Sequence, residues 1–315
     1  MATMTKTTTM KAACIHAFGG PEVLRIEEVP VPEPQAGQIL VHVRAAGVNP
    51  VDWKIREGQF GKMPLPSIMG SDFSGVIEAP GPKVEEFRVG QAVFGTVADE
   101  SGSYSEFALA PTSQIAEKPA ALDHETAAAL PTAGLTAWQA LFDKAELQPG
   151  QKVLIHAAAG GVGSLAAQFA RWKGARVLGT ASGQHVEFVR ELGAHDVIDY
   201  KKQRFEESVR DIDVVLDTIG GQTQERSWKV LKPGGIMVSI VQPPSKEAAA
   251  AHRARGVLLR CDVTRSDELA QIGELVASGD IKIHISTELP LSQARQAQEL
   301  SQGGHTQGKI VLKVS

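Results

Sequence analysis

The chain has 315 residues, about two domains' worth at roughly 150 residues each, and 43% of them are hydrophobic, enough for substantial cores. Its 32 basic and 36 acidic residues give a formal net charge of −4, which argues against a purely electrostatic nucleic-acid binder. The two cysteines, Cys14 and Cys261, build neither a disulfide framework nor a multi-cysteine zinc site, so we expect a cytoplasmic protein. No apolar run reaches about 18 residues, so no membrane partner is expected.

The opening segment is Thr-rich and lacks the apolar core of a signal peptide. We expect residues 1–9 to be a disordered leader with Met10 as the functional start; a truncated transit peptide is the alternative. From there to about Leu130, Pro and Gly break the chain into short strand-like segments: MKAACI, LRIEEVP, ILVHVRAAGV, GVIEA, AVFGTV and YSEFALA. This half therefore predicts a small β-rich domain.

The pattern changes near residues 148–150 to apolar strands that alternate with helical stretches: VLIHAA, RVLGTAS, DVIDY, DVVLDTIG and GIMVSIV. Such alternation predicts an α/β fold, with a parallel sheet covered by crossover helices. The last residues, GKIVLKV, have strand character again and could pair with the β-rich domain. We expect residues 10–130 and 285–315 to form the first domain and residues 131–284 the second.

A glycine-rich turn is the most informative segment. A buried-type strand ending at His156 is followed by a turn and then by a helix with apolar residues at helical spacing. The turn residues are Ala158, Ala159, Gly160, Gly161, Val162 and Gly163. Gly160 lets a pyrophosphate approach the backbone, Gly163 permits close packing of helix and strand, and the helix N-terminus presents free N–H groups. Strand, turn, helix and second strand in this order predict a dinucleotide site rather than a merely structural turn.

The end of the second strand favours NADP over NAD. An NAD site usually places an acid there, whereas this chain has no acid before Glu187. Ser182 can donate to a 2′-phosphate, and His185 can add a donor or charge, unless it only occupies a helix face. Tyr200 closes the third strand, where it either contacts the adenosine end or packs. We therefore predict NADPH/NADP as the cofactor.

The proton chemistry of common nicotinamide enzymes is missing. Neither Tyr104 nor Tyr200 begins a Tyr-x-x-x-Lys pair, and the nine histidines show no H-x-x-x-H spacing. We therefore expect no catalytic metal. The reaction must then depend on the positioning of substrate and cofactor and on one or two hydrogen bonds.

These motifs resemble the zinc-independent quinone oxidoreductase (zeta-crystallin-like) branch of the medium-chain dehydrogenase/reductases. The resemblance covers nearly the whole chain after Met10 and includes GVNPVDWK, PSIMGSDFSGVI, AALPTAGLTAWQAL, AAAGGVG, ELGAHDVIDY and LKPGGIMVSI. NPVDWK and GKIVLKV are similar to NADPH-dependent alkenal and enone reductases. Where zinc-dependent relatives carry Cys and Gly-His-Glu, this chain has Asn49-Pro50 and Gly70-Ser71-Asp72.

The resemblance implies a GroES-like β-rich catalytic domain followed by an inserted Rossmann domain. It also implies cofactor contacts at positions that match the family's motifs: Asn49, Lys54, Thr136, residues 160–163, Ser182, Tyr200, Ile240, Val241 and Lys309. Relatives often have Lys near the position of His185, so the clamp on the 2′-phosphate is predicted to be weaker here.

Our hypothesis is that hydride from NADPH reaches an enal, enone or quinone, and that Asn49 and Lys54 stabilise the resulting oxyanion. Asp52 would orient Lys54 or hold the loop; its alternative, like that of Asn49, is a structural role at a helix start. The proton would come from water or a cofactor hydroxyl. The alternatives are a quinone oxidoreductase proper, a low-turnover NADPH-binding sensor or RNA-associated protein, and an enoyl reductase separated from a synthase. Residues 256–261 predict a late strand that pairs in a homodimer, or an ordinary strand.

Overall fold

The computed structural model describes residues 9–61, 63–304 and 306–314. The leader predicted for residues 1–9 therefore lies outside the described residues, apart from Thr9, which begins the first strand. The chain divides into two compact units. The first contains the described residues up to Thr132 together with Val263–Ala277 and the described part of Ile283–Ser315; the second contains Ala133–Asp262 and Ser278–Lys282.

The first unit is rich in strands. Its elements are β1 (Thr9–Ile15), β2 (Arg25–Pro30), β3 (Gln38–Val48), α1 (Pro50–Arg56), β4 (Ser67–Ile68), β5 (Asp72–Pro80), β6 (Ala92–Thr96), β7 (Phe107–Pro111), β8 (Ile115–Glu117), α2 (His124–Ala128), α9 (Ser266–Ala277), β15 (Ile285–Pro290), α10 (Ala294–Gln302) and β16 (Lys309–Lys313). One sheet has the order β2-β1-β4, and a larger one has the order β15-β16-β3-β5-β6-β8, with β7 also paired to β3.

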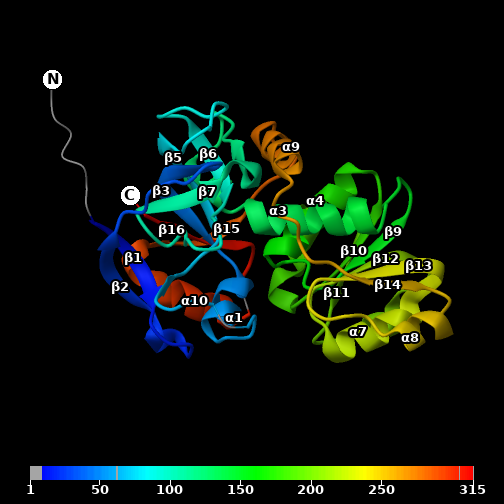
Figure 1. Ribbon diagram of the computed structural model, residues 1–315. Coiled ribbons are helices and arrows are strands. Elements are labelled where there is room, and N and C mark those ends of the chain that lie inside the picture. The colour runs from blue at the N-terminus through cyan, green and yellow to red at the C-terminus, as the bar shows by residue number, and fades with distance from the viewer. Residues whose placement is uncertain (1–8, 62, 305, 315) are drawn as a thin grey trace, which may run out of the picture. The chain divides into compact units, whose positions relative to one another are not determined.

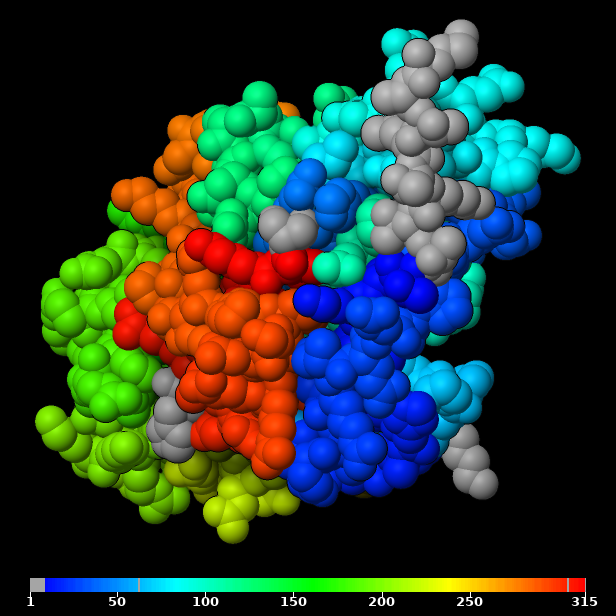
Figure 2. Space-filling model, turned by 90° about the vertical axis from the view of Figure 1, so that its left-hand side faces the viewer, coloured from blue at the N-terminus to red at the C-terminus, as the bar shows by residue number. Residues whose placement is uncertain are grey.

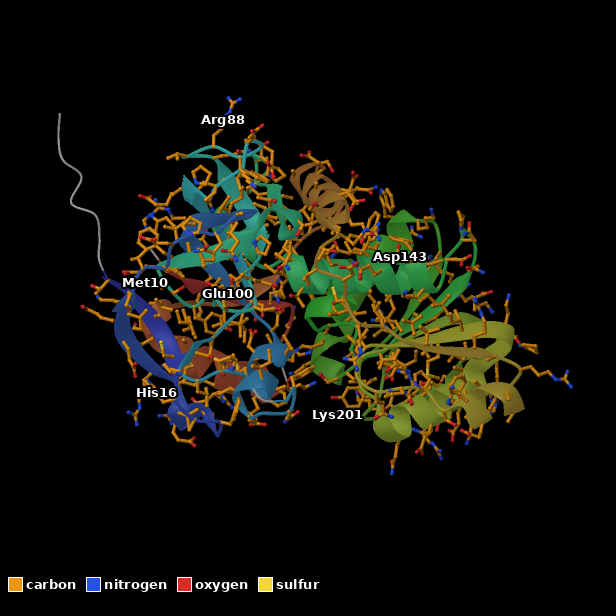
Figure 3. The ribbon with its side chains drawn as sticks, in the orientation of Figure 1. Met10, His16, Arg88, Glu100, Asp143 and Lys201 are labelled. Atoms are coloured by element: carbon orange, nitrogen blue, oxygen red, sulfur yellow. The ribbon has the colours of Figure 1, made fainter. Side chains whose placement is uncertain are left out.

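The C-terminal strand completes the larger sheet of this unit. β16 pairs antiparallel with β3, so that Ile310 lies opposite Val48. The orange-red C-terminal segment lies directly against the blue N-terminal part of the chain (Figure 2), as expected from the contacts of α10 with α1. Apolar side chains of β3 and β5, such as Val41 and Phe73, fill the core and are fully buried. Charged side chains such as Arg88 point outward (Figure 3).

The second unit is a parallel sheet with helices. Its elements are β9 (Lys152–Ile155), α4 (Gly161–Trp172), β10 (Arg176–Ala181), α5 (Val186–Glu191), β11 (Asp196–Asp199), α6 (Phe205–Ser208), β12 (Ile212–Asp217), α7 (Gly221–Ser227), β13 (Leu231–Ser239), α8 (Lys246–Ala251) and β14 (Arg255–Leu258). Helix α3 (Pro131–Trp138) joins the two units in sequence.

The strand order of the parallel sheet is β11-β10-β9-β12-β13-β14. Numbered along the unit, this is 3-2-1-4-5-6, the order of a Rossmann fold. The order in which strands are added to the sheet reverses between the first and fourth strands. Helices lie on both faces of the sheet (Figure 1), so central strands such as β12 are buried on both sides. The predicted fold class, a GroES-like β-rich part with a Rossmann sheet, is confirmed.

Helix α9 lies on the other side of the division between the two units than the predicted boundaries place it. The sequence boundaries place α9 in the second domain, whereas α9 contacts β8 and belongs to the first unit. Gly273 on this helix lies against Phe94 and Pro119 of the first unit, where a Cβ would meet the Phe94 ring at 2.9 Å.

Arg56 links the start of the first unit to its C-terminal helix. Its side chain is fully buried; its guanidinium donates to the Gly19 carbonyl oxygen at 3.2 Å, to Gln298 Oε1 at 2.9 Å and to Gln302 Oε1 at 3.1 Å. Glu57 lies 3.3 Å away and compensates the buried charge. A planar fork can serve these acceptors together, which a lysine ammonium on a longer, flexible stem does less well.

We predict that Arg56→Lys lowers the free energy of unfolding by about 2–4 kcal/mol, because buried acceptors lose their charged donors. Urea denaturation measures the change. Arg295→Lys is the matched control, since Arg295 is exposed and pairs with Glu299 on the surface of α10, where such pairs contribute little. Equal effects of the two substitutions would contradict the prediction.

Candidate functional site

The first unit places a polar cluster at the start of α1. Asn49 precedes this helix, and its backbone N–H donates to Asp52 Oδ2 at 2.8 Å, which closes the first helical turn. Pro50 occupies the first helical position, where no backbone N–H is needed. The sequence N-P-V-D thus produces a helix start in which both polar side chains are buried.

The Asn49 amide connects an ammonium to a carboxylate. Its Oδ1 accepts from Lys309 Nζ, and its Nδ2 donates to Asp72 Oδ2 at 2.9 Å. Lys309 Nζ also donates to the Val48 carbonyl oxygen at 3.2 Å. Lys309 begins β16 and Asp72 begins β5, so three elements from distant parts of the sequence meet at one amide. All three side chains are at most 4% exposed.

The carboxylate of Asp72 has further donors at the start of α3. Thr132 donates to it twice: from its backbone N–H at 3.1 Å to Oδ2 and from its hydroxyl to Oδ1. Burial raises the pKa of Asp72, while the Lys309 ammonium and the hydrogen bonds from Thr132 and Asn49 oppose the increase. Burial also lowers the pKa of Lys309, against the opposing effect of Asp72 and Asp52.

Asp52 accepts its short hydrogen bonds on one oxygen. Besides the Asn49 backbone, Tyr104 Oη donates to its Oδ2 at 2.8 Å, while Ser71 Oγ donates to Oδ1 over a longer distance of 3.5 Å. Burial raises the pKa of Asp52 to about 7, against the effect of the two hydrogen bonds. Burial, Asp52 and Asp72 in turn raise the pKa of Tyr104.

Lys54 has a separate position. Its Nζ lies 5.5 Å from the centroid of the Trp53 ring, a cation–π contact, and its side chain is half-buried. The hydrogen bonds recorded for Asp52 within the described chain go to Asn49, Tyr104 and Ser71 rather than to Lys54. They favour the alternative in which Asp52 holds the loop over the one in which it orients Lys54.

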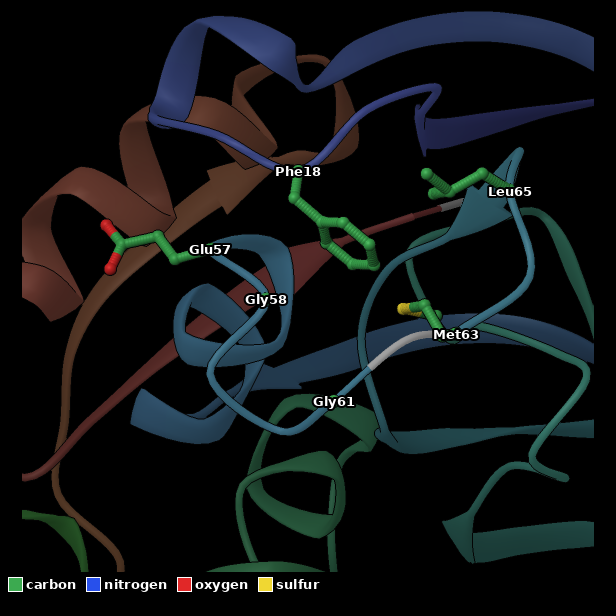
Figure 4. Close-up of a pocket in the computed structure, with 6 residues that line it drawn as sticks. All are labelled: Phe18, Glu57, Gly58, Gly61, Met63 and Leu65. Atoms are coloured by element: carbon green, nitrogen blue, oxygen red, sulfur yellow. The ribbon is translucent and has the colours of Figure 1, made fainter.

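The first unit contains two hollows, of which the smaller adjoins this cluster. A cavity of about 140 Å³ is lined by Asp52 and Ser71, by apolar residues and by further polar ones: Ile55, Met63, Ile68, Met69, Gly70, Val97, Ala98, Asp99 and Ser101. A larger, open pocket of about 570 Å³ lies beside Phe18, Gly58 and Leu65 (Figure 4), with Glu57 and Gly61 at its edge. Met63 lines both hollows.

The second unit contains the glycine-rich turn, between β9 and α4. A Cβ on Gly163 would lie 2.3 Å from the Ala157 carbonyl oxygen and 2.8 Å from Ala158 Cα, so only glycine allows this approach of helix and strand. A Cβ on Gly160 would meet only the Ala157 oxygen, at 3.4 Å. Residues 160–162 keep part of their surface exposed, and α4 begins at Gly161, so its first N–H groups have no acceptor within the helix.

The ends of β10 and β11 lie side by side. Ala181 pairs with Asp199, and the Tyr200 N–H donates to the Ala181 carbonyl oxygen at 3.2 Å, which places Ser182 next to Tyr200. His185 Nδ1 lies 3.5 Å from Ser182 Oγ. The Tyr200 side chain is 54% exposed, as a residue that contacts a ligand requires.

The remaining predicted cofactor residues of the second unit lie after strand β13, on helix α3 and in the glycine-rich turn. Ile240 and Val241 follow β13, and Val241 is exposed. Thr136 is buried on α3, and Ala159 is buried in the turn. The structure thus groups Asn49 with Lys309 and Asp52 in the first unit, and the turn residues with Ser182, His185 and Tyr200 along one edge of the parallel sheet.

Four members of the cluster were not predicted from the sequence: Asp72, Tyr104, Thr132 and Ser71. The position of Ser71 and Asp72 could have indicated a role, because Gly70-Ser71-Asp72 stands where zinc-dependent relatives carry Gly-His-Glu. Tyr104 gave none, because it approaches Asp52 from a loop 52 residues away.

Two further observations bear on metals and membranes. Within residues 9–61, 63–304 and 306–314, no group of three or more His, Cys, Asp or Glu side chains is arranged to hold a metal ion. Cys14 is buried and Cys261 is half-buried. No helix in these same ranges is long and apolar enough to cross a membrane.

Comparisons with known proteins agree with the two parts of the fold. The family described as alcohol dehydrogenase GroES-like domain matches residues 35–120, and the family described as zinc-binding dehydrogenase matches residues 192–312. A quinone oxidoreductase of Mus musculus is 36% identical and is aligned over 96% of this chain and 97% of its own length. An NADPH-dependent alkenal/one oxidoreductase, chloroplastic, of Arabidopsis thaliana is 34% identical over 96% of this chain and 79% of its own length.

Solved structures show the same relationship. The quinone oxidoreductase from Coxiella burnetii matches with a TM-score of 0.92 and 38% identity, over 98% of this chain and all of that one. The Escherichia coli quinone oxidoreductase complexed with NADPH matches with a TM-score of 0.90 and 31% identity, over 96% of this chain and 99% of that one. The chain therefore belongs to the medium-chain dehydrogenase/reductase superfamily, in the group of these quinone and alkenal/one oxidoreductases. It is an oxidoreductase, and the predicted resemblance is confirmed.

A buried histidine at the end of β9 makes the stability of the second unit depend on pH. His156 is 1% exposed; its Nε2 lies 2.8 Å from Ser227 Oγ and its Nδ1 lies 3.2 Å from Thr180 Oγ1. Burial lowers the pKa of His156 from 6.5 to about 4; Asp217 opposes this shift and Arg226 adds to it. The imidazole is therefore neutral in the folded chain at neutral pH.

We predict that the free energy of unfolding falls as the pH drops from 6.5 towards 4. In that range the histidine of the unfolded chain binds a proton and that of the folded chain does not. The resulting loss of unfolding free energy is on the order of 3 kcal/mol. Urea denaturation at pH 7 and 5 should show a smaller pH effect in His156→Gln than in the wild type. His252→Gln, at an exposed position on the same unit, is the control. An unchanged pH effect in His156→Gln would contradict the prediction.

Proposed function

We propose that this chain reduces α,β-unsaturated carbonyl compounds (enals and enones) or quinones with NADPH, without a metal ion. The observation that carries the proposal is the glycine-rich turn after the first Rossmann strand, followed by a strand end without an acid before Glu187. The names of the relatives, quinone oxidoreductase and NADPH-dependent alkenal/one oxidoreductase, support the substrate classes.

The residues present fit a dinucleotide. A Cβ on Gly160 would meet only the Ala157 carbonyl oxygen, so the space beside the turn backbone is open. The N–H groups that begin α4 suit a pyrophosphate. Ser182 and His185 are placed to donate to a 2′-phosphate, and the exposed Tyr200 to cover the adenosine end. When bound, NADPH supplies the hydride. The full proposed cofactor set is Asn49, Lys54, Thr136, Ala159, Gly160, Gly161, Val162, Gly163, Ser182, His185, Tyr200, Ile240, Val241 and Lys309.

The first unit supplies hydrogen-bond donors for the carbonyl end of the acceptor. Hydride addition places negative charge on the acceptor's oxygen, so fixed donors lower the barrier. The Asn49 amide is held in one orientation by Lys309 on its oxygen and Asp72 on its nitrogen. Lys54, which contacts the Trp53 ring and is half-buried, is our candidate for a second, cationic donor.

The proposal extends to organisation and location. We propose domain boundaries of 10–130 with 285–315, and 131–284, with α9 of the second range packed against β8 of the first unit. We also propose a homodimer formed through β14. This strand lies at the edge of the parallel sheet, where its outer backbone groups suit pairing with a second copy. A cytoplasmic location is supported by the small number of cysteines, two in 315 residues. We propose no nucleic-acid partner, in line with the negative net charge.

An assay of NADPH oxidation with trans-2-alkenals, cyclic enones and benzoquinones tests the reaction. We expect turnover with NADPH to exceed that with NADH, and enals or enones to be reduced at the carbon–carbon double bond with the carbonyl intact. Product analysis identifies the bond reduced. Activity on quinones alone would make the chain a quinone oxidoreductase proper. Binding of NADPH without turnover of any acceptor would favour a sensor.

Cofactor selectivity is tested at Ser182. We predict that Ser182→Asp weakens NADPH binding by about 10- to 100-fold, because a carboxylate repels the 2′-phosphate, and leaves NADH binding nearly unchanged. Titration of nicotinamide fluorescence measures both affinities. Ser208→Asp adds the same charge at an exposed position on α6 and serves as the control. Equal losses for NADPH and NADH would remove Ser182 from the phosphate site.

A further inference from the structure

The cluster in the first unit holds more acid than base. Asp52, Asp72 and Lys309 are 1%, 0% and 4% exposed. With all three ionised, the cluster would carry one net negative charge away from water, which is costly. The charged and titratable groups that face Asp52 are Asp72 from β5, Lys309 from β16 and Tyr104; Asp99 lines the adjoining cavity. One retained proton makes the cluster neutral.

The hydrogen bonds decide which acid retains this proton. Asp72 accepts three bonds spread over both oxygens, from Asn49 and twice from Thr132, and such bonds stabilise a carboxylate. Asp52 accepts two short bonds, from the Asn49 backbone and Tyr104, on Oδ2, and Oδ1 accepts only the longer bond from Ser71 Oγ at 3.5 Å within the described chain. Because the bond to its Oδ1 is long, Asp52 is the less stabilised anion of the two; burial raises the pKa of both acids, that of Asp52 to about 7.

The same bonds fix where the proton sits. With Oδ2 occupied by two donors, the proton of Asp52 belongs on Oδ1, whose neighbour is Ser71 Oγ at 3.5 Å. Asp52 and Ser71 both line the cavity of about 140 Å³, whose other walls include Met63, Ile68 and Val97. This volume is well above the roughly 10–15 Å³ that a single water needs. A buried acid thus borders a partly apolar cavity with room for a ligand.

We propose that Asp52 is the proton donor of the reaction, delivering the proton on its Oδ1 to the carbonyl oxygen of an acceptor bound in this cavity. The inference rests on the proposed function. Hydride from NADPH, which is oxidised to NADP⁺, forms a C–H bond at the β-carbon and leaves an electron pair on the acceptor's oxygen. The O–H bond of Asp52 breaks as the new O–H bond forms. The resulting enol tautomerises in water, and the Asp52 carboxylate regains a proton from water.

Tyr104 and the Asn49 backbone are positioning groups in this step. They hold Oδ2 and so direct Oδ1 toward Ser71. The bond from Tyr104 also stabilises the carboxylate left after proton transfer, which tunes the acid to neutral pH. Ser71 Oγ lies 3.5 Å from Oδ1 and is placed to orient the oxygen that receives the proton.

The protonation state is tested without cofactor by pH-difference infrared spectroscopy of the full chain. We expect the C=O band of a protonated carboxyl group near pH 6 that is lost by pH 9 in the wild type. This band should be missing in Asp52→Asn and retained in Asp196→Asn, a control at an exposed acid paired with Arg176. A band that persists in Asp52→Asn belongs to another acid and overturns the proposal.

The catalytic role is tested by the pH dependence of kcat/KM. Asp52→Asn should lower kcat/KM by about 100-fold or more, with NADPH affinity unchanged, and should abolish the fall of the wild-type rate above neutral pH. Tyr104→Phe keeps the acid but removes a bond to its anion, so this fall should move to higher pH. An Asp52→Asn rate and profile like the wild type's, or an unmoved profile in Tyr104→Phe, overturns the proposal.

These outcomes separate the proposal from the function on which it rests. If the wild type reduces no acceptor with NADPH, the proposed function fails, whatever the infrared spectra show. If the wild type is active and Asp52→Asn is equally active, the function stands and Asp52 is not the donor.

Discussion

The polar cluster of the first unit depends on the hydrogen bonds that the buried amide of Asn49 makes to Lys309 and Asp72. An amide can accept on one side and donate on the other, so it links the Lys309 ammonium to the Asp72 carboxylate without a direct contact between the charges. Its backbone N–H at the same time binds Asp52. A single residue before α1 thereby fixes groups from β5, β16 and the helix itself. A change of its side chain would remove one hydrogen-bond partner from each of two buried charges, Lys309 and Asp72.

The second unit meets a different physical demand, since it must expose backbone rather than bury side chains. Gly163 permits the helix to approach β9, because any Cβ there would overlap the Ala157 carbonyl oxygen. Gly160 has no such steric need, and the room at this position is what a phosphate requires. Two glycines three residues apart thus have different roles: Gly163 allows helix and strand to pack closely, and Gly160 leaves the backbone accessible to a phosphate.

Local patterns predicted much of the fold and part of the site. The alternation of strands and helices gave the Rossmann sheet, and the strand character of residues 308–314 pointed to the pairing of β16 with β3. The turn was visible because its residues are contiguous. The cluster was less visible, because Tyr104 and Asp52 are 52 residues apart and Lys309 and Asn49 are 260 apart. Pairing at that distance is set by tertiary structure, which no periodicity in one sequence encodes.

Charge balance connects the cluster to the chemistry. Had the cluster contained one acid and one amine, it would be neutral with no proton to give. The second acid makes it retain a proton at neutral pH, and the hydrogen bonds to Asp52 Oδ2 leave that proton on the oxygen nearest Ser71. A buried carboxyl with its pKa near neutrality can both donate a proton and be reprotonated by water. In the proposed reaction this group supplies the proton at the point where hydride addition leaves charge on an oxygen.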